Sequence, residues 1–197
     1  MLYCHHLPGP FKGLSQLQSL DLRGNNFSTL PIGMFDGIGS GKLFATLDEE
    51  SYFWKNESSL RLVGLNFELP VGVFDGLTML QELSLTSSSL KRPLPAGVFR
   101  DLTRLEKLSL TNNSLSTIDL GTLQQSFQQL TGLRELDLQN NNLETLPAGI
   151  FEGLKDLQIL DLQSNGLKML PGVFSNLRHL HNLSLRNNGL EVLPSRA

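Results

Sequence analysis

The chain has 197 residues, of which 40% are hydrophobic, and it carries a formal net charge of -3. Because it has no basic excess and no run of lysines or arginines, a nucleic-acid partner is not expected. Hydrophobic residues are spread along the chain instead of forming one long run, so direct insertion of this chain into a membrane is not expected.

The N-terminal segment predicts neither a disulfide nor a secretory leader. Cys4 is the only cysteine, so the chain cannot form an internal disulfide. The segment also lacks the basic region and long apolar run of a signal peptide. Residues 7–14 match the second half of the repeated unit described next, and residues 190–194 stop halfway through another. We therefore expect both ends to be uncapped and the chain to be a fragment.

A leucine pattern is first complete in residues 17–38 and returns most regularly in residues 133–154, LRELDLQNNNLETLPAGIFEGL. Leu136 and Leu138 lie two positions apart, which places both side chains on one face of a short strand. Asn141 then turns the chain, and the later apolar residues fill the return path. One such unit cannot bury its hydrophobic side alone, so it predicts stacked neighbours of the same kind.

These neighbours are present along the whole chain. Units begin at Leu17, Leu80, Leu105, Leu133, Leu157 and Leu180, and an imperfect unit begins at Glu57. Most steps between units are close to 24 residues, a period of about the length of a solenoid repeat. We expect a single solenoid over residues 1–197, with about seven coils and a partial N-terminal coil.

Residues 39–57, GSGKLFATLDEESYFWKNE, break the pattern. This irregular insertion carries Trp54, the only tryptophan, and three consecutive acidic residues. It is a functional loop, a degenerate repeat or a wrongly predicted coding segment, and long inserts in repeat proteins commonly carry binding function.

Two later coils also depart from the template. Ser88 replaces the turn asparagine in the unit that begins at Leu80. In the next unit Asp119 replaces the usual proline, and extra residues in GTLQQSFQQL, residues 121–130, predict a short helix on the convex side.

Two columns of repeated side chains are expected to hold the coils together. An amide both donates and accepts, so stacked asparagines satisfy the backbone groups of adjacent turns. These asparagines are Asn25, Asn113, Asn141, Asn165 and Asn188. Stacked phenylalanines are expected in the core: Phe35, Phe74, Phe99, Phe127, Phe151 and Phe174.

Residues that alternate with the strand leucines face away from the core and form columns on the concave face. These residues vary while the frame stays constant, which suits recognition of another macromolecule through a few anchors. Ile159 is the best candidate anchor, although a single surface isoleucine is also an ordinary finding. The candidate ligand-binding residues are Asp21, Arg23, Lys107, Glu135, Asp137, Gln139, Ile159, Asp161, Gln163 and Arg186.

Catalysis is not predicted. Asp137 and Asp161 are expected on adjacent strands of an open surface, where no pocket encloses them. No nucleophile or glycine-rich phosphate loop is evident, so no enzyme activity, metal or cofactor is expected. The histidines form no set with carboxylates or cysteines at metal-ligand spacing: His5, His6, His179 and His181.

Three phrases carry a family resemblance: LPVGVFDGLTMLQELSL, LPAGVFRDLTRLEKLSL and LPAGIFEGLKDLQILDL. They resemble the phenylalanine-containing class of leucine-rich repeat proteins, whose repeat is about 24 residues long. Variable lymphocyte receptors, Slit proteins and Toll-like receptor ectodomains belong to this class. The resemblance implies an α/β solenoid, a right-handed curved array with a parallel β-sheet on its concave face. Short helical, 3-10 or extended segments are implied on the convex side.

The same resemblance implies recognition of a protein ligand, or of a glycan, through the concave face. The chain would then belong to a secreted or cell-surface receptor or to a matrix protein. An intracellular leucine-rich repeat scaffold in signalling, and hence a cytoplasmic location, is the alternative, for which the absence of a signal peptide is the main observation.

Four sequons for N-glycosylation begin at Asn26, Asn56, Asn112 and Asn182. They fit an extracellular protein, but chance occurrence in a repeat rich in asparagine and serine explains them equally well. A glycan on Asn112 or Asn182 is expected on the concave side.

Overall fold

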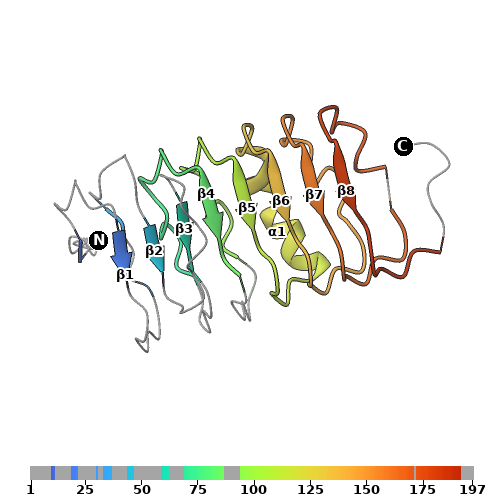
Figure 1. The fold of residues 1–197 in the computed structure, drawn as a ribbon, viewed down its shortest axis with the longest axis horizontal. Coiled ribbons are helices and arrows are strands. Elements are labelled where there is room, and N and C mark those ends of the chain that lie inside the picture. Colours follow the sequence, from blue (N-terminus) through green and yellow to red (C-terminus); the bar gives the residue numbers. More distant parts are fainter. Residues whose placement is uncertain are drawn as a thin grey trace, which may run out of the picture.

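A computed structural model describes residues 10–11, 19–21, 30, 33–36, 44–46, 59–62, 69–86, 94–170 and 172–191. These residues form a row of short parallel strands joined by turns and one helix, as Figure 1 shows. The strands are β1 Ser19–Asp21, β2 Phe44–Thr46, β3 Ser59–Arg61, β4 Glu82–Ser84, β5 Lys107–Ser109, β6 Glu135–Asp137, β7 Ile159–Asp161 and β8 Asn182–Ser184. The helix is α1, Thr117–Gln128.

The strands follow one another in space in the order of the sequence. Strands β3 to β8 form a six-stranded sheet, and β1 and β2 form a two-stranded one. All pairs are parallel, and the central residues of β3 to β8 are leucines that align in register. The central leucine of each of β3 to β7 is buried, because alternate side chains of a strand point to opposite faces. The predicted α/β solenoid with a parallel sheet is therefore confirmed.

Strand β2 lies inside residues 39–57, the segment predicted to be an irregular insertion. Its central residue, Ala45, is the register partner of Leu20 in β1, and β2 also contacts β3. The leucine pattern did not predict this strand because its central residue is alanine, where β1 and β3 to β8 have leucine. Trp54 and the acidic residues of this segment lie outside the described residues.

Leucines and phenylalanines fill the space between the sheet and the return segments. Five phenylalanines are fully buried: Phe35, Phe74, Phe99, Phe127 and Phe151. The rings of Phe74 and Phe99 stack with their centroids 6.3 Å apart, and those of Phe151 and Phe174 stack at 6.2 Å. Between these pairs, α1 supplies Phe127, so the aromatic column continues through the coil that contains the helix.

The helix α1 lies behind the sheet, on the convex side, as Figure 1 shows. Asp119 accepts a hydrogen bond from the Ser116 amide at 2.6 Å, and its negative charge in the first turn favours the start of a helix. The amide of Gly97 donates to the buried Ser126 hydroxyl at 3.0 Å. A Cβ on Gly153 would lie 2.3 Å from the Gln128 Cα, so the helix approaches the next coil too closely for any side chain there. The helix predicted in residues 121–130 is confirmed, although it begins earlier, at Thr117, and ends at Gln128.

Asparagines at the ends of the strands connect adjacent coils. In Asn141, Nδ2 donates to the Leu110 carbonyl of the preceding coil and to the Leu138 carbonyl of its own coil, both at 3.0 Å. Its Oδ1 accepts from the Leu115 amide at 3.1 Å. Matching bonds are made by Asn165 and Asn188. Asn113 makes the Nδ2 bonds, and Asn25 lies outside the described residues.

Candidate recognition surface

The strand register brings the variable side chains of the concave face into columns. The first column contains Glu82, Lys107, Glu135, Ile159 and Asn182. The second contains Ser84, Ser109, Asp137, Asp161 and Ser184. Thr86, Thr111, Gln139, Gln163 and Arg186 follow the strands at equivalent places. Of the remaining candidates, Asp21 is described only as backbone in β1, and Arg23 lies outside the described residues.

The part of the face over β4 to β6 contains a chain of opposite charges. The Nζ atom of Lys107 lies 3.1 Å from Glu135 Oε1 and 3.8 Å from Glu82 Oε1. The hydrogen bond that Lys107 donates to Glu135 is the main cause of the raised pKa of Lys107, since it favours the charged ammonium group. Lys107 is therefore already paired with carboxylates on both neighbouring strands.

Two residues of this part are less accessible than the alternating pattern predicts. Glu82 is only 7% exposed, and Ser84 is also buried. The Ser84 hydroxyl lies 2.6 Å from the Thr86 hydroxyl, and Ser109 and Thr111 form the same pair at 2.9 Å. Alternation predicts which way a side chain points but not what covers it, so the burial of Glu82 and Ser84 could not be anticipated.

The part of the face over β6 to β8 is different. Asp137 and Asp161 are register partners on adjacent strands, so two carboxylates lie side by side. Each uses Oδ1 to accept a backbone amide two residues later, from Gln139 at 2.9 Å and from Gln163 at 2.8 Å. Among the described residues, no basic side chain forms an ion pair with either carboxylate. Each therefore retains an oxygen that can accept a bond from a ligand.

Ile159 lies in the first column beside these carboxylates. It is 37% exposed, and its register partners are Glu135 on β6 and Asn182 on β8. An exposed β-branched side chain between polar neighbours offers a rigid apolar contact. We call Asp137, Ile159, Asp161, Gln163 and Asn182 the β6–β8 patch.

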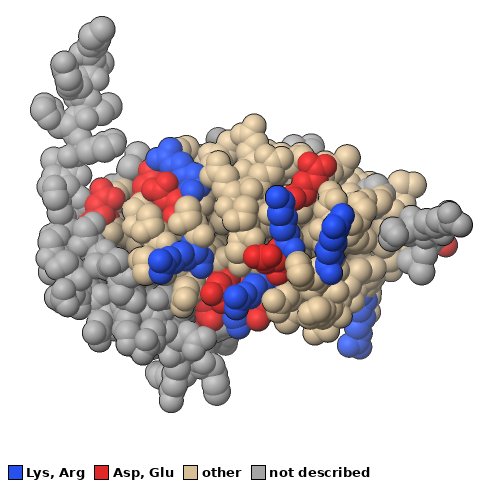
Figure 2. Space-filling view, turned by 90° about the horizontal axis from the view of Figure 1, so that it is seen from above, with Lys and Arg blue, Asp and Glu red and all other residues tan. Residues whose placement is uncertain are grey.

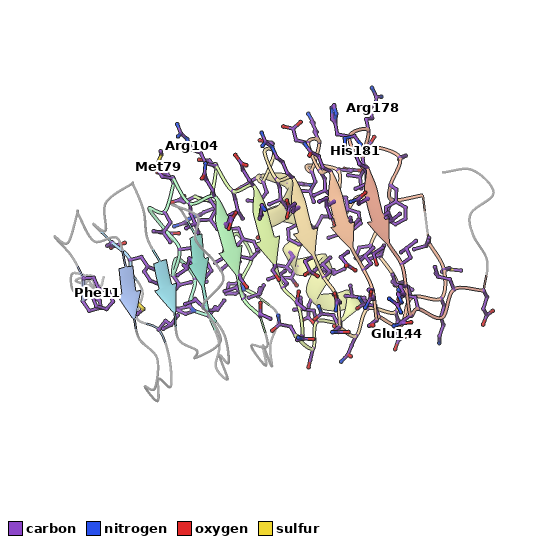
Figure 3. The ribbon with its side chains drawn as sticks, viewed as in Figure 1. Phe11, Met79, Arg104, Glu144, Arg178 and His181 are labelled. Atoms are coloured by element: carbon purple, nitrogen blue, oxygen red, sulfur yellow. The ribbon has the colours of Figure 1, made fainter. Side chains whose placement is uncertain are left out.

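The edge at which the strands begin carries charges of both signs. In Figure 3 the side chains of Arg104, Arg178 and His181 lie along this edge, and Glu144 lies at the opposite edge. Basic and acidic groups are interspersed when this edge is seen from above in Figure 2. One contact there joins Arg134 to Glu106 at 3.3 Å. A mixture of charges provides no single-sign track for a phosphate backbone.

A metal cluster and a membrane-spanning helix are both absent from the described part of the chain. No group of three histidine, cysteine, aspartate or glutamate side chains could hold a metal ion there. No helix among those residues is long and apolar enough to cross a bilayer.

Comparison with family models matches residues 67–115 and 131–190 to a leucine-rich repeat model. A model of two leucine-rich repeat copies matches residues 103–150, and a single-repeat model matches residues 16–38. These matches cover more than half of the chain, so the chain belongs to the leucine-rich repeat family. Such repeats form a recognition module and not an enzyme.

Comparison with solved structures finds a similar fold in a chain of the Toll–Spätzle complex of Drosophila, in its glycosylated form. The match has a TM-score of 0.56 and 23% sequence identity, and it covers 90% of this chain. The chain spans only 28% of the length of that structure. No curated protein sequence matches the chain significantly.

Proposed function

We propose that this chain recognises a protein ligand through the β6–β8 patch of its concave face. The observation that carries this proposal is Ile159, an exposed apolar side chain beside Asp137 and Asp161, two carboxylates with no basic partner among the described residues. An apolar side chain that a ligand buries completely, with surrounding groups that exclude water, can supply much of the binding energy of a protein interface.

The contrast with β4 to β6 supports this location. A ligand that binds Lys107, Glu82 or Glu135 must first separate groups that are already paired, which offsets much of the gain. A basic ligand side chain that approaches Asp137 or Asp161 breaks no ion pair. The complementary ligand surface therefore carries lysine or arginine next to an apolar residue.

We place the protein outside the cell, in a secreted or cell-surface receptor or matrix protein. The phenylalanine-containing repeat class and the four sequons support this setting. The Toll chain with a similar fold was solved in complex with Spätzle, which is an example of protein recognition by such a solenoid.

The experiment uses a biotinylated tetramer of the chain against an array of purified secreted and cell-surface ectodomains, with a glycan array in parallel. Each hit is measured again with Ile159→Ala and with the double variant Asp137→Lys, Asp161→Lys. We expect protein hits whose binding weakens by about tenfold or more with Ile159→Ala. We expect the double reversal to abolish binding. Circular dichroism should show a folded variant with a lower melting temperature, because the Gln139 and Gln163 amides lose their carboxylate acceptors.

The chain offers matched controls outside the strands. Met169 is a more exposed apolar residue than Ile159, and Glu144 and Glu191 are exposed acidic residues. Met169→Ala and the double variant Glu144→Lys, Glu191→Lys should leave binding unchanged. Equal binding by parent and patch variants refutes the location, and hits on the glycan array alone refute the ligand class.

A further inference from the structure

We infer that Asn182 is an N-glycosylation site and that its glycan covers the β6–β8 patch. This inference rests on the proposed extracellular function, since the modification requires passage through the secretory pathway. Asn182, Leu183 and Ser184 form the sequon and coincide with β8. Asn182 is exposed, and within the described part of the chain its side-chain amide has no hydrogen bond that would hold it against the protein.

The modification joins the asparagine side chain to a sugar. The Asn182 Nδ2 atom would lose one proton and form a bond to C1 of the first sugar of a lipid-linked oligosaccharide. The lipid pyrophosphate would depart with the electron pair of the broken C1–O bond. The linked amide retains its second N–H and its carbonyl oxygen, so β8 loses no backbone hydrogen bond.

The position of Asn182 determines what this glycan would cover. Its register partner in β7 is Ile159, and neighbouring strands lie about 4.7–4.9 Å apart. Because both side chains leave the same face of the sheet, the first sugar would lie next to Ile159. A ligand that requires the apolar anchor and a glycan on Asn182 would therefore exclude each other. The proposed recognition then belongs to molecules whose Asn182 is unmodified, and the occupancy of Asn182 sets the fraction of the protein that can bind.

The sequon at Asn112 is a natural comparison within the same chain. Asn112 lies in the turn after β5, with a positive φ of 54°, and its Oδ1 accepts a hydrogen bond from Asn140 Nδ2 at 2.7 Å. Its own Nδ2 makes no hydrogen bond among the described residues, so a glycan there would extend from the edge of the array. Asn112 lies in the turn after β5 and on no described strand, so a glycan there is expected to lie farther from the β6–β8 patch than one on Asn182.

The experiment uses the full chain, secreted from mammalian cells behind an added signal peptide, with Cys4→Ser to remove the only thiol. Glycopeptide mass spectrometry measures occupancy at Asn112 and Asn182. A reporter thiol introduced by Ile159→Cys is then labelled with a maleimide, with and without Asn182→Gln. A second reporter, Thr111→Cys after β5, measures general accessibility.

We expect occupancy at Asn182 and a several-fold faster labelling of the Ile159→Cys reporter when Asn182→Gln removes the glycan. Asn112→Gln should leave this rate unchanged, and the Thr111→Cys reporter should not respond to Asn182→Gln. If Asn182 is unmodified, the inference that it is a glycosylation site is wrong, whether or not Asn112 is occupied. If Asn182 is modified but the labelling rate of the Ile159→Cys reporter does not change, the glycan does not cover the patch.

The proposed function is tested independently of this result. The ectodomain array is screened with Asn182→Gln protein, which carries no glycan at the patch. Failure of that screen contradicts ligand recognition, while failure of the occupancy or labelling measurement contradicts only the glycan.

Discussion

The contribution of the asparagine column to stability can be tested most directly at Asn141, which is 6% exposed. Its side-chain amide donates through Nδ2 and accepts through Oδ1. In Asn141→Ala, the Leu110 carbonyl keeps a second donor in Asn113, and the Leu138 carbonyl keeps one in Asn165. The buried Leu115 amide, in contrast, loses its acceptor.

The expected loss in the free energy of unfolding follows from these broken hydrogen bonds. An unsatisfied buried amide costs about 1–3 kcal/mol, and each lost hydrogen bond to a carbonyl that keeps another donor costs about 0.5–1.5 kcal/mol at most. We expect Asn141→Ala to lower the free energy of unfolding by about 2–4 kcal/mol. Asn141→Asp should cost at least as much, because a carboxylate oxygen would face the Leu110 and Leu138 carbonyls in place of the donor.

Urea denaturation followed by circular dichroism measures this change, and hydrogen exchange at the Leu115 amide reports it locally. Asn142→Ala is the matched control, since Asn142 is exposed and its side chain makes no hydrogen bond among the described residues. The control should change the free energy of unfolding by less than about 0.5 kcal/mol. If Asn141→Ala is equally mild, the column does not supply the stability assigned to it.

Further predictions concern the close approach of Gly153 to the helix α1 and the ion pairs of Lys107. Gly153→Ala should destabilise the fold by about 1–3 kcal/mol, because its Cβ would meet the Gln128 backbone. Gly121→Ala in α1, where a Cβ meets nothing, should instead stabilise the fold by about 0.5–1 kcal/mol. Urea denaturation decides both. Because the folded-state pKa of Lys107 is raised, its contribution is present at neutral pH and lost above pH 10.5. Lys107→Met should therefore lower the free energy of unfolding by less than about 1 kcal/mol at neutral pH, and by still less above pH 10.5.

The frame of the solenoid could be predicted because each coil repeats the same few residues. Leucines two positions apart indicate a strand, and the asparagine and phenylalanine positions indicate its turn and its core filling. Strand β2 escaped prediction because Ala45 replaces the leucine, and only stacking between neighbouring coils reveals it. The extra residues of α1 were visible in the sequence, but the contact of Gly153 with the helix depends on how the two coils pack.

The candidate surface was predictable in its columns and not in its pairings. Alternation along each strand placed Lys107, Asp137 and Ile159 on one face, as the register shows. That Lys107 is shared by Glu82 and Glu135 follows only from side-chain conformations that sequence spacing does not define. These pairings distinguish the part of the face over β4 to β6, where charges are paired, from the β6–β8 patch, where two carboxylates have no basic partner among the described residues.

One substitution can give Asp137 of the β6–β8 patch a basic partner. Ser109 is the register partner of Asp137, and Lys107 shows that a lysine on β5 reaches a carboxylate on β6. Ser109→Lys should therefore pair with Asp137 and weaken binding of any ectodomain captured by the array, while the protein stays folded by circular dichroism. Ser109→Gln, which is long but neutral, is the control and should bind more tightly than Ser109→Lys. Equal binding by the two variants would mean that the unpaired charge of Asp137 contributes nothing to recognition.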